Sequence, residues 1–556
     1  MSELVLGPLL RYVGEREATV WVETDSAGEV EILGHRARTF EVEGHHYALV
    51  RIEALEPGTT NDYEVALDGE RVWPPATSPY PPSVIRTLDP SRPYRLLFGS
   101  CRIALPHGPP YNLRHDEDPR ARELDALYAY ALRMSTRPHE EWPDLVLWLG
   151  DQVYADDPSL GARSFAASRR DVTEPPGKHV ADFEEYTHLY LDSWSDPLVR
   201  WLLSTVSSAM IFDDHDVHDD WNISEAWVAK MRSKPWWHER IVGALMSDWL
   251  YQHLGNLSPR ERDQDPVYRL IDAGEDAGPL VRELAERADR DPGAARWSFH
   301  RNLGGTQLVA IDSRAGRVLD CSGRRMLDDA EWEYVKRHSR GDCDHLLIAT
   351  SVPFLLPAGM HHLEQWNERV CSGAWGRLAA RVGEAIRQAI DLEHWAAFDD
   401  SFRELAELER SVAAGERGAA PSAIVTLSGD VHHAYLYEVG FRRDPAAPAV
   451  TANGRSAVYQ AVCSPMRNPL SDPERRAIRL ASSRPFIAAA RLLARAAGAR
   501  DHDIRWRPAG RNQPWFNNHL ATLELDGRRA LVRLERPVPG KGGSPQLEQV
   551  AERRLT

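Results

Sequence analysis

Residues 207–222, SSAMIFDDHDVHDDWN, hold the most informative pattern in this chain. The apolar run from Ala209 to Asp213 suits a buried strand, and the eight residues from Asp213 to Asp220 include five aspartates and two histidines. Open α/β sheets bind ligands at the carboxyl ends of their strands. Carboxylates this close together repel one another unless protons or a cation neutralise them. The pattern therefore predicts an α/β sheet with a metal site at its edge, and the alternative is a solvated acidic loop.

Three further apolar runs end in residues that can bind metal ions. A single Gly-Asp after such a run is common, but four strand ends of this kind in one chain form a specific combination. Carboxylate, imidazole, phenolate and thiolate groups together can hold two metal ions, and a shared aspartate can bridge them and leave room for a bridging hydroxide. The runs are Tyr94–Gly99 before SCR (100–102), Leu145–Gly150 before DQVY (151–154) and Ile424–Gly429 before DVHH (430–433).

Other apolar runs extend the predicted sheet structure. They are nearly continuous, as expected for strands buried on both faces, and helical patterns separate them, so a layered α/β domain is expected from about residue 90. Residues 473–500 are expected to form one Arg/Ala-rich amphipathic helix, whose arginines either line a solvated face or overhang an anionic substrate. The runs are Gln307–Asp312, Leu346–Ser351 and Val458–Cys463.

The N-terminal part has a different pattern. Residues 1–72 contain short runs that alternate apolar and polar residues, as strands do, and a Pro-Gly turn before Tyr63 resembles the tyrosine corner of sandwich domains. A fibronectin-III-like β-sandwich is therefore expected. A stiff, proline-dense linker follows. The predicted domains are 1–88 for the sandwich and 89–540 for the α/β domain, and the residues after Gly540 are expected to fray.

The composition argues against several functions. The chain has 556 residues and a net charge of −16, which argues against a nucleic-acid-binding surface. It has no stretch of about 18 apolar residues that would predict a transmembrane segment, and its first residues lack the pattern of a secretory signal. The five cysteines are odd in number and never spaced CxxC, which fits a reducing compartment. A cytoplasmic location is therefore expected.

In their order along the chain, the four strand ends resemble the motifs of the PhoD-type alkaline phosphatases, a branch of the calcineurin-like metallophosphoesterase superfamily. Three further segments, AIDSR (310–314), MLDDAEW (326–332) and EHWAAFDDSFREL (393–405), are also similar to segments of that family. The resemblance covers about residues 90–530. It implies a four-layer α/β/β/α metallophosphoesterase domain after the β-sandwich and a mixed Fe³⁺/Ca²⁺ centre, with Zn²⁺ or Mn²⁺ as alternatives.

The resemblance also implies roles for individual residues. Cys101, Asp151 and Tyr154 match the family's iron ligands. His215 matches the histidine that donates a proton or stabilises the transition state beside the metals. The other candidate metal ligands are Asp214, Asp219, Asp220, Asp430 and His432, and the other candidate catalytic residues are Asp214 and Arg102, where Arg102 either binds phosphate or is structural.

Two positions depart from the family pattern. The family reads DDHE-V-x-N-N-W where this chain reads DDHDVHDDW (213–221), so the carboxylates of Asp219 and Asp220 replace amides. This change leaves the identity of the second metal open. Ser351 stands where the superfamily commonly has a histidine.

The expected activity is hydrolysis of a small phosphoric ester by a metal-bound hydroxide at a dinuclear centre. The alternative within enzymes is a phosphodiesterase or phospholipase-D-like activity, and the alternative outside them is a non-catalytic metal-binding protein. The sequence leaves open the preference for monoesters or diesters and the oligomeric state.

Overall fold

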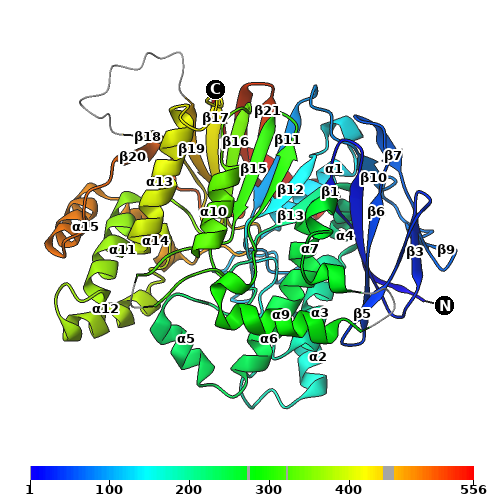
Figure 1. Cartoon of the computed structure of the whole chain (residues 1–556), viewed down its shortest axis with the longest axis horizontal. Coiled ribbons are helices and arrows are strands. Elements are labelled where there is room, and N and C mark those ends of the chain that lie inside the picture. Colours follow the sequence, from blue (N-terminus) through cyan, green and yellow to red (C-terminus); the bar gives the residue numbers. More distant parts are fainter. Residues whose placement is uncertain (1, 272–275, 321–322, 442–455) are drawn as a thin grey trace.

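The computed structural model describes residues 2–271, 276–320, 323–441 and 456–556, and two β-sheets lie at its centre (Figure 1). The first sheet contains three parallel neighbours whose carboxyl ends lead to Cys101, Asp151 and Asp213. These residues therefore lie at one edge of the sheet. The strand order is β13 (Ser207–Met210), β12 (Leu145–Trp148), β11 (Tyr94–Gly99), β21 (Leu520–Asp526), β22 (Arg529–Pro539) and β23 (Pro545–Arg554).

The second sheet contains four parallel neighbours, one of which ends just before Asp430. The predicted run Ile424–Gly429 corresponds to this strand, shifted by one residue. The strand order is β14 (Phe299–Leu303), β15 (Thr306–Ile311), β16 (His345–Thr350), β17 (Ala423–Ser428), β19 (Ala457–Val462), β18 (Tyr435–Phe441) and β20 (Ile504–Pro508).

Apolar clusters hold the layers together. Leu96 and Leu147 of the first sheet and Leu347 and Val425 of the second belong to one buried cluster, which joins the two sheets. Successive strand residues point to opposite faces, so neighbouring residues such as Trp148 pack outward against helices. The outer helices are α1 (Ala126–Met134), α3 (Phe183–Trp194), α4 (Pro197–Thr205) and α6 (Trp237–Ser247) on the first sheet, and α10 (Asp329–His338) and α13 (Asp399–Ala413) on the second.

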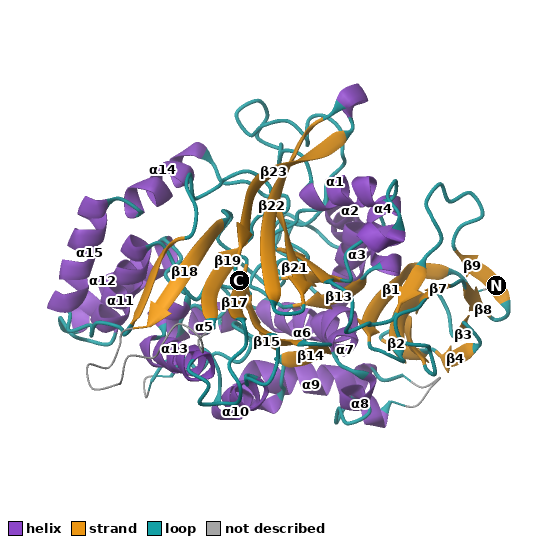
Figure 2. Ribbon diagram, turned by 90° about the horizontal axis from the view of Figure 1, so that it is seen from above, coloured by secondary structure: helices purple, strands orange, loops and turns teal. Residues whose placement is uncertain are grey.

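An all-β region precedes the α/β region and lies at one end of the molecule (Figure 2). Its strands form three small sheets. They are β1 (Leu4–Val13), β2 (Ala18–Thr24), β6 (His45–Ile52) and β5 (Phe40–Val42); β4 (His35–Arg38), β3 (Glu29–Ile32), β8 (Val65–Leu67) and β9 (Glu70–Trp73); and β10 (Val84–Arg86) with β7 (Thr60–Asp62).

The interface between the all-β region and the α/β region combines apolar packing with buried hydrogen bonds. Leu9 and Trp21 of the all-β region share a buried cluster with the outer helices of the first sheet. Arg11 is fully buried and donates to the backbone carbonyls of Tyr251 and Gln252, each at 2.7 Å. The Tyr63 hydroxyl, which the sequence suggested for a local corner, donates instead to the carbonyl of Ser204 in α4 at 2.5 Å. The all-β region is therefore packed firmly against the α/β region.

Three segments differ from the sequence expectation. β13 begins two residues earlier than predicted and ends at Met210, so Asp213 lies beyond the strand. Residues 473–500 form two helices, α14 (Asp472–Ala481) and α15 (Arg484–Ala496), because Pro485 lacks the N–H that a continuous helix needs. The residues after Gly540 were expected to fray, but β23 pairs with β22 and completes the sheet edge.

The remaining helices lie outside these layers. Within the described residues, no helix is long and apolar enough to cross a lipid bilayer. The helices are α2 (Leu160–Arg169), α5 (Glu225–Arg232), α7 (Leu254–Asn256), α8 (Pro259–Arg262), α9 (Gly278–Arg290), α11 (Ala358–Cys371) and α12 (Arg377–Ala389).

Candidate metal centre

The strand ends bring candidate metal ligands into three groups. In each group, one ligand atom from every residue lies within 4.8 Å of the others. Asp151 belongs to two groups and Asp214 belongs to two, so the groups form one continuous row that a pair of metal ions can share. The groups are Cys101, Asp151 and His432; Asp151, Asp213 and Asp214; and Asp214, His215 and Asp219.

The backbone at these strand ends is left-handed, which is rare for residues other than glycine. The φ angle is 55° at Cys101, 52° at Asp151, 65° at Asp430 and 52° at His432. Such a conformation costs about 1–3 kcal/mol per residue, and it clusters at functional sites. These four residues follow three parallel strands, and they mark the carboxyl ends of those strands as the candidate site.

We call Cys101, Asp151, Tyr154 and His432 the Asp151 pocket. The Cys101 sulfur and the Tyr154 hydroxyl lie 3.2 and 3.3 Å from the same oxygen of Asp151, Oδ2. The other oxygen, Oδ1, is buried and has no hydrogen-bond partner among the described residues. A buried oxygen without a partner is costly, so this atom is well suited to contact a cation.

Hydrogen bonds hold the pocket residues in place. Nδ1 of His432 donates to the carbonyl of Asn468 at 2.7 Å, which leaves the lone pair on Nε2 for a metal. The Asn468 amide also donates to the Tyr154 hydroxyl at 3.2 Å, and the Ser464 hydroxyl donates to the Cys101 sulfur at 3.2 Å. Such outer contacts fix the orientation of metal ligands.

Burial keeps Cys101, Asp151 and Tyr154 protonated unless a cation is present. It raises the pKa of the Cys101 thiol to about 12 and the pKa of the Tyr154 hydroxyl well above its usual range. Burial, and then the nearby Cys101, also raise the pKa of Asp151 well above its usual range. A thiolate and a phenolate form here only beside a strong Lewis acid, so the donor set fits a metal ion of that kind.

We call Arg314, Asp213, Asp214, Glu393 and Asp430 the Arg314 cluster. The fully buried guanidinium contacts Asp213 at 2.5 Å, Asp214 at 3.0 Å and Asp430 at 3.2 Å, and it also contacts Glu393. Arg317 also contacts Glu393, at 3.1 Å, so two buried arginines face four carboxylates and negative charge remains in excess. Oδ2 of Asp213 is buried and lacks a hydrogen-bond partner among the described residues. The cluster can therefore anchor a second cation beside the Asp151 pocket.

His394 adds positive charge to the same carboxylates. Its Nδ1 lies 2.6 Å from Glu364 and its Nε2 lies 3.1 Å from Asp430. Although burial opposes the charge, Glu364 and Asp430 raise the pKa of His394 to about 10. Despite burial, His394 and Arg314 in turn lower the pKa of Asp430. Arg314 and His394 thus hold the Asp430 carboxylate, which was predicted to be a metal ligand, in its anionic form.

His215 is oriented by a carboxylate. Its Nδ1 lies 3.0 Å from both oxygens of Asp156, and its ring lies 4.5 Å from that of Tyr154. Burial opposes the charge, but Asp156 and Asp214 raise the pKa of His215 well above its usual range. These carboxylates favour the protonated form of His215, which is the form that an acid catalyst needs.

The two carboxylates that replace family amides differ in their surroundings. Asp219 is exposed, and it lies 3.9 Å from Nε2 of His215. The backbone of Asp220 donates to Asp214 at 3.0 Å, and its buried Oδ1 has no hydrogen-bond partner among the described residues. Burial, and then Glu393, raise the pKa of Asp220 to about 9. A cation beside Asp214 would relieve the repulsion around Asp220.

Arg102 is engaged elsewhere. Its buried guanidinium forms an ion pair with Asp125 at 2.8 Å and donates to the carbonyl of Ser193 at 3.2 Å. These contacts fit a structural role. A contact between Arg102 and phosphate remains a prediction.

Several residues of the site had no assigned role in the sequence analysis. Arg314 and His394 lie in the AIDSR and EHW segments that marked the family resemblance, but nothing in those segments indicates that they contact Asp430. Asp156 follows Tyr154 by two positions and could have been noted as a partner for His215. Asn468 lies in no pattern at all.

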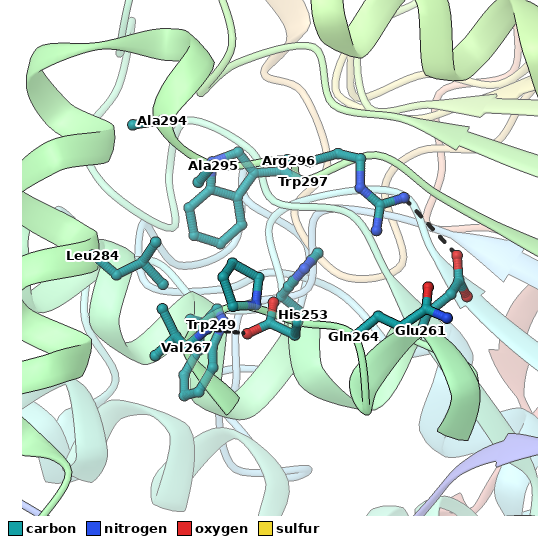
Figure 3. Close-up of a pocket in the computed structure, with 12 residues that line it drawn as sticks. Trp249, His253, Glu261, Gln264, Val267, Leu284, Ala294, Ala295, Arg296 and Trp297 are labelled. Carbon is teal, nitrogen blue, oxygen red and sulfur yellow. Dashed lines mark hydrogen bonds and ion pairs between the residues drawn. The ribbon is translucent and has the colours of Figure 1, made fainter. Parts of the chain in front are cut away.

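A separate cavity of about 330 Å³ lies between α9, the helical turn that follows α6, residues 261–267 and the segment before β14 (Figure 3). Trp249, Trp297 and Leu284 line it, and Glu261 and Arg296 form an ion pair 3.9 Å long beside it. His253, Gln264 and Asp265 also line it. The strand-end edge, and not this cavity, brings together the candidate ligands.

Comparisons with known proteins agree with the architecture. Residues 1–85 match a domain of unknown function, DUF7800, and residues 126–476 match the PhoD-like phosphatase family. A solved structure described as "Structure of PhoD" is 12% identical, with a TM-score of 0.57, and the match covers 99% of this chain and 92% of that chain, which shows a shared fold. No curated protein matches the chain. Since the family match spans more than half of its residues, the chain belongs to the PhoD-like phosphatase family.

Proposed function

We propose that this protein hydrolyses phosphoric esters at a dinuclear metal centre. The observation that carries the proposal is the overlap of the three ligand groups through Asp151 and Asp214, because two ions that act together need shared or adjoining carboxylates. Membership of a phosphatase family supports the same class of reaction.

We assign Fe³⁺ to the Asp151 pocket, because a thiol and a phenol bind best to a strong Lewis acid. We assign Ca²⁺ to the carboxylates of Asp214, Asp219 and Asp220, since Ca²⁺ prefers oxygen ligands. Zn²⁺ or Mn²⁺ are the alternatives. When bound, the two ions supply Lewis-acid chemistry, which activates water and neutralises the charge that develops on the phosphoryl group.

The chain's own residues complete the reaction. His215, held by Asp156, donates a proton to the departing alkoxide. Arg314 and His394 keep Asp430 anionic and in place. The N-terminal region is a fibronectin-III-like sandwich in front of a four-layer α/β/β/α domain. Through Arg11 it holds the helical segment at Tyr251 and Gln252 in place. We propose a cytoplasmic location.

Turnover by the metal-replete, full-length protein on nitrophenyl monoesters and diesters tests this function. Hydrolysis of either ester that is lost in the Asp151→Asn variant supports the proposal. The ratio of the two rates separates a phosphatase from a phosphodiesterase or phospholipase-D-like enzyme. Metal-replete protein that turns over no phosphate ester would contradict the proposal and favour a metal-binding role.

A further inference from the structure

Three helices at one end of the molecule combine exposed leucines with exposed arginines. They are α12, α14 and α15, which gather around α11 at the end opposite the all-β region (Figure 2). Trp375, just before α12, donates to the carbonyl of Ala496 at the end of α15 at 3.4 Å, so these two helices adjoin. We call the outward sides of α12, α14 and α15 the helical face.

Large apolar side chains stand out on the helical face. The exposed fraction is 77% for Leu378, 61% for Leu480 and 70% for Leu492. In α12, Leu378 and Val382 are four residues apart and so lie on one side of the helix, away from the buried Gly383. In α15, Ala490 and Ala494 are buried, whereas Leu492 projects outward. These leucines are therefore not parts of the protein core.

The helical face is basic in an acidic protein. The net charge of the chain is −16, yet residues 475–500 contain seven arginines and no aspartate or glutamate. Within the described part of the chain, no ion pair neutralises Arg381, Arg476 or Arg484. Arg377 and Arg381 flank the apolar side of α12, because they are offset by one residue from Leu378 and Val382. A surface of this kind attracts an anionic partner.

We propose that the helical face docks on an anionic lipid bilayer. Helices with apolar residues on one side and arginines beside them lie in the interface of such a membrane, where the apolar side chains enter the acyl boundary and the arginines meet the phosphate headgroups. The exposed leucines stand on the outward sides of three separate helices, which suits a fluid bilayer better than the shaped pocket of a protein partner.

Docking would bring the candidate centre close to the bilayer. α14 begins four residues after Asn468, whose side chain and carbonyl contact Tyr154 and His432. The start of α14, at one end of the helical face, is therefore linked by a short segment to a residue that contacts the Asp151 pocket. A phosphoester carried in the membrane would be presented near the ligand row.

Co-sedimentation of the full-length protein with lipid vesicles tests the proposal. We expect binding to vesicles of phosphatidylcholine with phosphatidylserine, little binding to phosphatidylcholine alone, and release by high salt. The variant Arg381→Gln/Arg476→Gln/Arg484→Gln should bind on the order of 100-fold more weakly, because each arginine near a charged surface contributes about fivefold. The variant Leu378→Ser/Leu480→Ser/Leu492→Ser should also lose binding, since its leucines no longer enter the bilayer.

Two matched controls make the result specific. Arg529→Gln removes an arginine that is 85% exposed at a distant turn, and Leu270→Ser removes a leucine that is 61% exposed elsewhere. Both should bind vesicles as the unaltered protein does, and thermal unfolding should show that all variants are folded. Absence of vesicle binding by the unaltered protein, equal binding to neutral vesicles, or dimers that only the leucine variant abolishes would overturn the proposal.

Discussion

The Asp151 pocket and the Arg314 cluster adjoin, but their buried acidic groups differ in what can neutralise them. In the Arg314 cluster, the protein supplies its own cations, Arg314 and His394, which hold Asp430 in the anionic form. In the Asp151 pocket, the neighbours of Asp151 are a thiol and a phenol whose pKa values burial raises. Asp430 is thus anionic without a metal, whereas Cys101 and Tyr154 become anionic only when a metal binds. The comparison teaches that buried arginine and histidine can hold one candidate ligand, Asp430, in its anionic form, whereas the thiol and the phenol of the pocket depend on the metal for their charge.

The largest effect is expected from Asp151→Asn, which removes the anion shared by two ligand groups. An amide supplies no charge to hold two cations together. We expect turnover to fall to the background of the assay, with loss of one or both metals, measured by metal analysis and a nitrophenyl ester assay. Normal turnover with both metals bound would remove Asp151 from the centre.

Arg314→Gln should remove the central positive charge of the Arg314 cluster without removing a candidate metal ligand. It leaves Asp213, Asp214, Asp430 and Glu393 without their central cation. Loss of one partner from a buried ion pair costs about 3–5 kcal/mol. We expect the free energy of unfolding to fall by about that amount in urea titrations, and Arg529→Gln, at an exposed site, to serve as the control. A change below about 1 kcal/mol would show that Arg314 is not the counter-charge of the cluster.

His215→Ala should separate chemistry from metal binding. Nitrophenolate departs without a proton, whereas an alkyl alkoxide needs one, and general acid catalysis contributes about 10²–10⁴-fold. We therefore expect a loss in that range on alkyl esters and a much smaller loss on nitrophenyl esters, with metal content unchanged. Asp156→Asn, which disturbs the Nδ1 contact of His215, should show the same pattern more weakly. Equal losses on the two ester types would assign His215 to positioning.

The smallest effect is expected from Asp220→Asn, which restores the amide of the family pattern. Activity should survive with an altered metal preference. In metal-free protein, the folded-state pKa of Asp220 of about 9 lies above its unfolded value. The folded state therefore binds the proton more tightly, and stability should fall as pH rises from about 4 to 9. Thermal unfolding across that range should show a shallower fall in Asp220→Asn, and an unchanged slope would contradict the pKa shift.

The sequence predicts the first sheet and the candidate ligands at its edge well, because both arise from local patterns. The apolar runs Tyr94–Gly99 and Leu145–Gly150 correspond to β11 and β12, and Cys101 and Asp151 follow them directly. Parallel neighbours end at the same edge of a sheet, so the meeting of these two residues could be expected before the structure was known. His432 follows β17 of the second sheet, so its approach to them depends on how the two sheets pack. The family resemblance is confirmed by the match over residues 126–476.

The counter-charges could not be predicted, because they depend on long-range contacts. Arg314 reaches Asp213 across 101 positions in sequence, and no period or spacing signals that pairing. For the same reason, the ion pair of Arg102 with Asp125 was not foreseen. The break between α14 and α15 was readable, since Pro485 stands in the middle of the predicted helix.

The central claim is that the Asp151 pocket binds a metal through the phenolate of Tyr154 and the thiolate of Cys101. Visible absorption of the untreated protein, recorded together with its metal content, tests this claim. The account predicts a coloured protein that contains iron, with a charge-transfer band that shifts or disappears in Tyr154→Phe while the iron is retained. A colourless and fully active protein that contains only zinc would contradict it.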